Sequence, residues 1–124
     1  MQHILYIAAG GAIGAVLRFG VSNGVYGMFG RNFPYGTLVV NVLGSLLIGV
    51  LSILFIERYT LNPEVRAIFI IGILGAFTTF STFSMETFNL LENGEFFKAL
   101  LNILLSVTLC LVATWAGVLL GRQL

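Results

Sequence analysis

Charged side chains are scarce in this 124-residue sequence: Lys, Arg, Asp and Glu together make up 9% of it, against about a quarter of an ordinary soluble domain. Hydrophobic residues make up 58%, and the mean hydropathy is +1.02. A water-exposed surface cannot be built from so few charges. The composition therefore excludes a soluble globular domain and predicts an all-α integral membrane protein.

Basic charge, cysteine and histidine are also sparse. The net charge of +1 provides no basic face, so we expect no nucleic-acid partner. A single cysteine, Cys110, excludes an internal disulfide and a cysteine-cluster metal site, and we interpret it as a small packing residue. The one histidine, His3, stands near the start of the chain and leaves no Ser–His–Asp set. We therefore expect no enzymatic activity.

The few charges divide the chain into long apolar stretches. A helix needs about 20 mostly apolar residues to cross a bilayer. We predict one transmembrane domain over residues 1–124, with four spans at about 4–26, 36–56, 64–91 and 96–121. The third span is the longest, which favours a tilt or a break. The first lacks a basic start and contains Arg18, so we do not expect a cleaved signal peptide.

The loop charges give the chain no preferred orientation. With four spans, both termini and the second loop share one side of the membrane. That side has Arg58, Arg66 and Arg122, whereas the other has Arg31, Lys98 and, nearest to it, Arg18. The positive-inside rule needs an excess on one side. We therefore hypothesise that the chain inserts both ways and that two antiparallel copies pair.

Small residues recur at helical spacing in the first span. Gly10 and Gly14 form one G-x-x-x-G pair, and Gly20 and Gly24 form another. Glycines at this spacing let two helix backbones approach closely in lipid. The pattern predicts close helix packing, although it also arises by chance in apolar helices.

Three polar side chains inside the spans need a partner or a use. Arg18 lies about 21 Å along the first helix, where it either reaches the head groups or faces a wet vestibule that attracts anions. Asn41 either makes an interhelical hydrogen bond or lines a pore. Glu86 lies near an exit interface or is a functional group.

The fourth span carries Asn102, Ser106 and Cys110 on one helix face, at i, i+4 and i+8. Ser106 could bond its own backbone four residues back. A polar line along the helix is the alternative, and the sequence does not choose between them.

The centre of the third span, residues 75–86, is dense in hydroxyl groups. Phe77, Phe80 and Phe83 recur every third residue, and between or beside them stand Thr78, Thr79, Ser81, Thr82 and Ser84. The Phe stripe is typical of packing, but ring edges can also face a small anion. Gly75 and the β-branched run after it favour a broken helix. A break there would free backbone carbonyls near Gly75 and Thr78 for a cation and aim a helix N-terminus at an anion path.

Over nearly its whole length the chain resembles the small dual-topology fluoride channels of the Fluc (CrcB) family. The resemblance rests on Gly10-Gly11-x-x-Gly14-Ala15-x-x-Arg18, Gly36-Thr37-Leu38-Val39-Val40-Asn41, Gly44, and Gly75-x-x-Thr78-Thr79-Phe80-Ser81-Thr82-Phe83-Ser84 with Glu86. Ala76 departs from a double glycine common in the family.

The resemblance implies an antiparallel homodimer with two pores in a bacterial inner membrane, surrounded by lipid, that exports fluoride passively from the cytoplasm. The implied pore residues are Asn41, Thr79, Phe80, Ser81, Thr82, Phe83, Glu86 and, less directly, Ser106. Arg18 matches the vestibule arginine. The backbone carbonyls of Gly75 and Thr78 from both copies would hold a structural Na⁺ at the dimer axis.

Two other functions stay open. A four-span dual-topology multidrug exporter would carry a proton-coupled Glu in its first span, where this chain has Arg18. A membrane assembly subunit without transport would have no use for the rows of hydroxyl and amide side chains.

Overall fold

The computed structural model describes residues 2–58 and 62–124, and the described residues are helical with short connections and no strand. The helices are α1 (Gln2–Phe29), α2 (Tyr35–Ser52) with its wider continuation η1 (Ile53–Arg58), α3 (Pro63–Arg66), η2 (Ala67–Leu74), α4 (Gly75–Phe77), α5 (Phe80–Glu92) and α6 (Phe96–Gln123). Four stretches are long and apolar enough to cross a membrane: His3–Phe29, Tyr35–Phe55, Pro63–Glu92 and Phe96–Gln123. The predicted all-α fold with four spans is confirmed.

Local sequence signals account for several helix ends. The chain leaves α1 at Gly30, whose φ of +83° favours glycine. The side chain of Asn62 accepts a hydrogen bond from the Val65 backbone N–H at 3.0 Å, with Pro63 in the first turn of α3. Thr37 lies in the first turn of α2, which begins at Tyr35.

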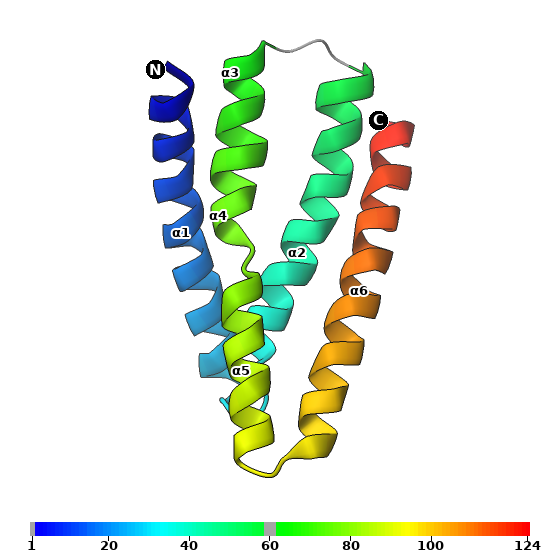
Figure 1. Cartoon of the computed structure of the whole chain (residues 1–124). Coiled ribbons are helices and arrows are strands. Elements are labelled where there is room, and N and C mark those ends of the chain that lie inside the picture. The colour runs from blue at the N-terminus through cyan, green and yellow to red at the C-terminus, as the bar shows by residue number, and fades with distance from the viewer. Residues whose placement is uncertain (1, 59–61) are drawn as a thin grey trace.

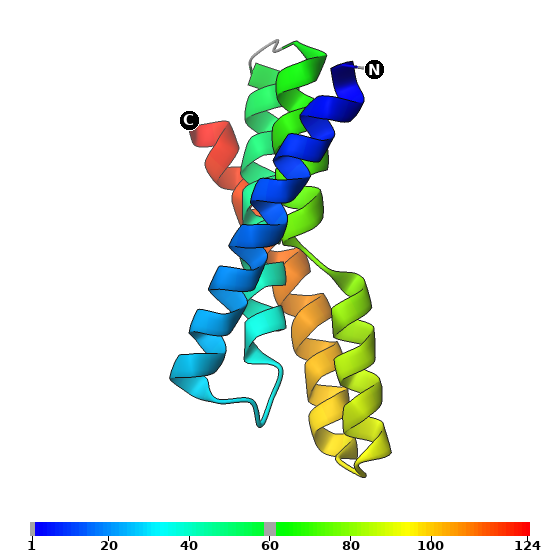
Figure 2. The same ribbon diagram turned by 90° about the vertical axis from the view of Figure 1, so that its left-hand side faces the viewer.

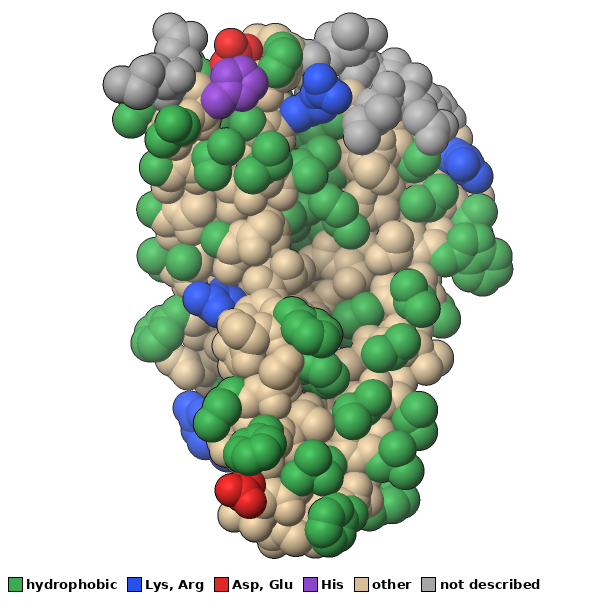
Figure 3. Space-filling model, viewed as in Figure 1, with side chains coloured by type: hydrophobic (Ala, Val, Ile, Leu, Met, Phe, Trp, Pro, Cys, Tyr) green, Lys and Arg blue, Asp and Glu red, His purple; other side chains and the backbone are tan. Residues whose placement is uncertain are grey.

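The four spans form an open arrangement (Figures 1 and 2). The N-terminus, α3 and the C-terminus lie at one end, and the turn between α5 and α6 lies at the other. Hydrophobic side chains are spread over the face shown in Figure 3 from end to end, and its acidic side chains lie near the two ends. This distribution is that of a surface made for lipid or for another apolar surface, not for water.

Close backbone contacts hold the spans together in pairs. A Cβ on Gly10 of α1 would stand 2.5 Å from the Ile68 carbonyl oxygen and 3.2 Å from the Gly72 Cα of η2. A Cβ on Gly49 of α2 would meet the Gly117 Cα of α6 at 3.1 Å. Each pair therefore packs at a separation that only glycine permits.

The two glycine pairs of α1 behave differently. A Cβ on Gly14 would also clash with η2, at the backbone of Ile73, so the first pair packs as predicted. By contrast, a Cβ on Gly20 or Gly24 would meet no atom within 4 Å. The second pair therefore makes no close contact within this chain.

The third span is broken, as predicted, and the break lies in the hydroxyl run just after Gly75. That residue is helical (φ −61°, ψ −37°), and α4 continues to Phe77. The extended residues are Thr78 (φ −84°, ψ 157°) and Thr79 (φ −152°, ψ 122°), after which α5 begins. In Figure 2 the ribbon leaves α4 at this point, and α5 continues in a new direction beside the first half of α6.

Candidate functional site

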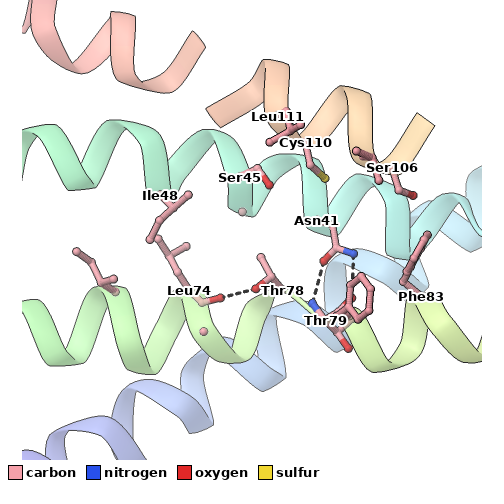
Figure 4. A pocket seen from close by; sticks show the side chains of 15 residues that line it. Asn41, Ser45, Ile48, Leu74, Thr78, Thr79, Phe83, Ser106, Cys110 and Leu111 are labelled. Carbon is pink, nitrogen blue, oxygen red and sulfur yellow. Dashed lines mark hydrogen bonds between the residues drawn. The ribbon is translucent and has the colours of Figure 1, made fainter. Parts of the chain in front are cut away.

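The break in the third span is closed by a side chain from the second. Asn41 on α2 donates from Nδ2 to the Thr79 carbonyl oxygen at 2.9 Å, and the Thr79 N–H donates to Asn41 Oδ1 at 2.8 Å (Figure 4). Both backbone groups of Thr79, which the helix cannot satisfy, are therefore paired. Of the two interpretations of Asn41, the interhelical hydrogen bond is present. Asn41 can line a pore while it makes this bond, because its amide nitrogen carries a second N–H.

A cluster of hydroxyl groups lies at the start of α5. Thr79 Oγ1 accepts from the Thr82 backbone N–H at 3.3 Å and so caps the helix. The same oxygen is hydrogen-bonded to the hydroxyls of Thr82 (3.2 Å) and Ser81 (3.3 Å). Three of the predicted pore residues thus gather at a helix N-terminus, where the helix dipole favours negative charge.

The same contacts leave backbone carbonyls at the break without their helical donors. The Leu74 carbonyl accepts from both the N–H and the hydroxyl of Thr78, each at 3.1 Å. The N–H of Thr79 is engaged by Asn41, and that of Thr82 by the Thr79 side chain. In the part of the chain that the structure describes, the carbonyls of Gly75 and Thr78 therefore receive no helical hydrogen bond. Carbonyl oxygens without a donor are the ligand type that a hard cation prefers.

A cavity of about 470 Å³ extends along the break, between α2, the third span and α6 (Figure 4). It brings together seven of the residues predicted for pore or cation: Asn41, Gly75, Thr78, Thr79, Phe80, Phe83 and Ser106. The rings of Phe80 and Phe83 lie 5.3 Å apart at an interplanar angle of 43°. Phe80 is 76% exposed, whereas Phe77 is 6% exposed and packs in the interior. The stripe therefore divides into one packing ring and two rings beside the cavity.

Arg18 does not line that cavity but a smaller one of about 150 Å³. This cavity also contacts Thr79 and Thr82 at the break, together with Phe19, Ser22, Thr37 and Val40. The Arg18 side chain is half-buried. It faces a hollow that reaches the hydroxyl cluster, which favours the vestibule interpretation over an arginine that only reaches the head groups.

Glu86 lies apart from both, in a third cavity of about 360 Å³ near the end of the molecule where α5 meets α6. The Tyr26 hydroxyl donates to Glu86 Oε2 at 2.7 Å. Arg31 and Lys98 line the same cavity. The structure therefore places Glu86 at a polar mouth and not beside the Phe80 and Phe83 rings.

Ser106 belongs to a buried hydrogen-bond chain between α6 and α5. Its hydroxyl lies 3.4 Å from Asn102 Oδ1, Asn102 Nδ2 donates to Thr87 Oγ1 at 2.8 Å, and the Thr87 hydroxyl donates to the Phe83 carbonyl at 2.8 Å. Asn102 is 2% exposed. Ser106 thus bonds the Asn102 side chain and not its own backbone, so two of the three residues of the predicted polar line are joined on α6. The chain of hydrogen bonds ends at the backbone carbonyl of Phe83, whose ring borders the cavity.

The sequence analysis did not identify two residues of this site, Tyr26 and Thr87. Thr87 stands one turn after Phe83, and this spacing was the available signal. For Tyr26 the sequence has no such signal, because its partner lies 60 positions away.

Four spans, with one interrupted at a cluster of hydroxyl and amide groups beside an open cavity, define a membrane protein of the ion- or solute-transporting class. A family model described as "CrcB-like protein, Camphor Resistance (CrcB)" matches residues 5–118. The chain belongs to this family.

Curated relatives cover nearly the whole chain. A protein of Methylococcus capsulatus is 58% identical over 118 residues, which are 95% of this chain and 52% of the relative. Proteins of Geobacter sulfurreducens and Coxiella burnetii are 55% and 53% identical over 124 residues, which are 100% and 99% of this chain and 100% of each relative. All three are named fluoride-specific ion channel FluC. The chain therefore spans about half of the first relative and the whole of the other two.

Proposed function

We propose that this chain is a multi-pass bacterial membrane protein that conducts fluoride passively and selectively out of the cytoplasm. The observation that carries the proposal is the break at Thr78 and Thr79, which Asn41 closes and which collects hydroxyl groups beside two phenylalanine rings. Relatives that are named fluoride-specific channels support it over their full length.

Fluoride is small and strongly hydrated, so a pore must replace its water with hydrogen-bond donors. Hydroxyl and amide donors can do so without holding the ion as tightly as a buried full charge would. In the proposed pathway, Arg18 attracts the anion into its cavity, and the hydroxyls of Thr79, Ser81 and Thr82 receive it.

The remaining pathway residues act on either side of that cluster. Asn41 offers its free N–H, and the rings of Phe80 and Phe83 present their positive edges. Ser106 lines the same cavity, and Glu86 stands in the cavity near the turn between α5 and α6, next to that of Arg18. The membrane potential, negative inside, drives the anion outward without any coupled reaction.

We propose further that two copies assemble as an antiparallel dimer with two such pathways. Non-helical backbone at mid-membrane is tolerated only where protein or a cavity covers it. In one chain the break borders an open cavity, with Phe80 76% exposed and Ser81 also exposed. A second copy against this face would cover both, and the balanced loop charges allow it to insert in the opposite orientation.

A structural Na⁺ at the dimer axis fits the unused carbonyls of Gly75 and Thr78. Two copies would contribute four carbonyl oxygens, which are ligands suited to a hard cation. Such an ion would hold the two breaks in register.

Fluoride efflux from liposomes tests the function. The purified protein is reconstituted with fluoride inside, valinomycin and potassium balance the charge, and a fluoride electrode records release. We expect rapid fluoride release and chloride release close to that of empty liposomes. Fluoride release no faster than from empty liposomes would overturn the proposal.

A further inference from the structure

The Tyr26 hydroxyl joins three spans at the boundary between two cavities. It donates to Glu86 Oε2 at 2.7 Å and lies 3.4 Å from Thr37 Oγ1. Tyr26 and Glu86 line the mouth cavity of about 360 Å³, and Thr37 lines the Arg18 cavity. One phenol therefore connects α1, α2 and α5 where the two hollows meet.

The direction of these hydrogen bonds follows from the proton count. A phenol has one proton, and the short contact with the carboxylate takes it. At the 3.4 Å contact Thr37 must then be the donor and the Tyr26 oxygen the acceptor. Thr37 is buried. The relay of hydrogen bonds therefore runs from Thr37 to Tyr26 and ends with the Tyr26 O–H donating to Glu86.

Within the described residues, Tyr26 provides the hydrogen bond that the Glu86 carboxylate receives. The second oxygen, Oε1, is enclosed and has no partner there. The two nearby cations are engaged elsewhere: Arg31 lies 4.5 Å over the Tyr26 ring, and Lys98 donates to the Asn32 carbonyl at 3.2 Å. Lys98 also pairs with Glu95 at 3.6 Å. The orientation of Glu86 thus depends on a single phenol.

On the basis of the proposed fluoride channel, we propose that Tyr26 is the positioning residue for Glu86. Its O–H fixes the carboxylate in one orientation and offsets part of its negative charge at the mouth through which the anion passes. Without this bond, the carboxylate would present more of its negative charge to the anion at the mouth and repel it more strongly. Because hydrogen bonds to charged groups are among the stronger ones, its loss corresponds to about a tenfold slower flux.

Tyr26→Phe tests the proposal, because it removes the hydroxyl alone and keeps the ring under Arg31. We expect fluoride efflux from liposomes to slow about tenfold. In a Glu86→Gln background, Tyr26→Phe should change the rate little, because the side chain at position 86 then has no charge to offset. Tyr35→Phe is the matched control: its ring packs on Phe29 and Phe33 near the same end, and its rate should equal that of the parent.

Two results would overturn the positioning role: an unchanged rate for Tyr26→Phe, or the same fold-loss with Glu86 and with Gln at position 86. The second would show that Tyr26 acts through packing. If Tyr26→Phe yields no folded protein, Thr37→Val removes the upstream donor. Its slowing should be smaller and should also vanish with Glu86→Gln; a slowing that persists contradicts the relay. A parent protein without fluoride efflux would instead contradict the channel function itself.

Discussion

The side-chain amide of Asn41 pairs with the backbone amide of Thr79 through two hydrogen bonds, of 2.9 and 2.8 Å. The pair is a substitute for helix geometry: a side chain from one span provides the donor and the acceptor that another span lacks. It stabilises the break at Thr78 and Thr79, from which the hydroxyl cluster and the unused carbonyls both follow. Asn41 therefore serves the fold and the proposed pathway together.

Asn41→Asp should weaken this closure. The aspartate can still accept from the Thr79 N–H, but it places an acceptor against the Thr79 carbonyl, where Asn41 donates. Leaving such a group unsatisfied costs about 1–3 kcal/mol. We expect a lower thermal midpoint in detergent and at least tenfold slower fluoride efflux. Asn23→Asp, at an exposed position of α1 that lines none of the three cavities, is the control. Parent-like values for Asn41→Asp would show that the pair is dispensable.

Phe83→Ile should slow fluoride efflux without disrupting assembly. The substitution keeps an apolar side chain at the 470 Å³ cavity but removes the ring edge. Size-exclusion chromatography checks that the protein stays assembled. Phe88→Ile, at a half-exposed ring on the same helix, should leave the rate unchanged. If both variants conduct like the parent, the ring of Phe83 serves packing alone.

Gly10→Ala should destabilise the fold through a clash between α1 and η2. The added Cβ would lie 2.5 Å from the Ile68 carbonyl oxygen, and crowding of this kind costs about 1–3 kcal/mol. At the neighbouring Gly11 a Cβ would meet no atom within 4 Å, so Gly11→Ala should leave the thermal midpoint unchanged or raise it. Equal midpoints for the two variants would contradict the close approach.

Removal of Na⁺ should impair the protein if the carbonyls of Gly75 and Thr78 hold that ion. We expect fluoride efflux to fall when sodium is replaced on both membrane faces by N-methyl-D-glucamine, and to recover when sodium returns. The bulky organic cation cannot enter a site made of four carbonyl oxygens. Efflux rates and thermal midpoints that do not change with sodium would contradict the proposed Na⁺ site.

The spans and the region of the break follow from the sequence alone. Scarce charges delimit the helices, and the hydroxyl run after Gly75 predicts a discontinuous third span. The position of the break does not follow, because it depends on Asn41, which is 38 residues away from Thr79. The sequence pattern covers Gly75 and the hydroxyl run after it, and within this stretch Gly75 itself stays helical.

The sequence predicted which residues belong to the site, but it did not predict which of them contact one another. Asn41, Thr79, Phe80, Phe83 and Ser106 do line one cavity. The division into three cavities, with Glu86 in a separate mouth, depends on tertiary contacts such as the one from Tyr26. A pattern along one chain contains no information about which distant hydroxyl will meet a carboxylate.

The reversal potential of the reconstituted protein in a planar bilayer, with potassium fluoride on one side and an equal concentration of potassium chloride on the other, tests the central claim most directly. A passive fluoride-selective channel predicts a steady current with a large reversal potential of the sign set by fluoride. A reversal potential near zero, or no current above that of the bare bilayer, would contradict it.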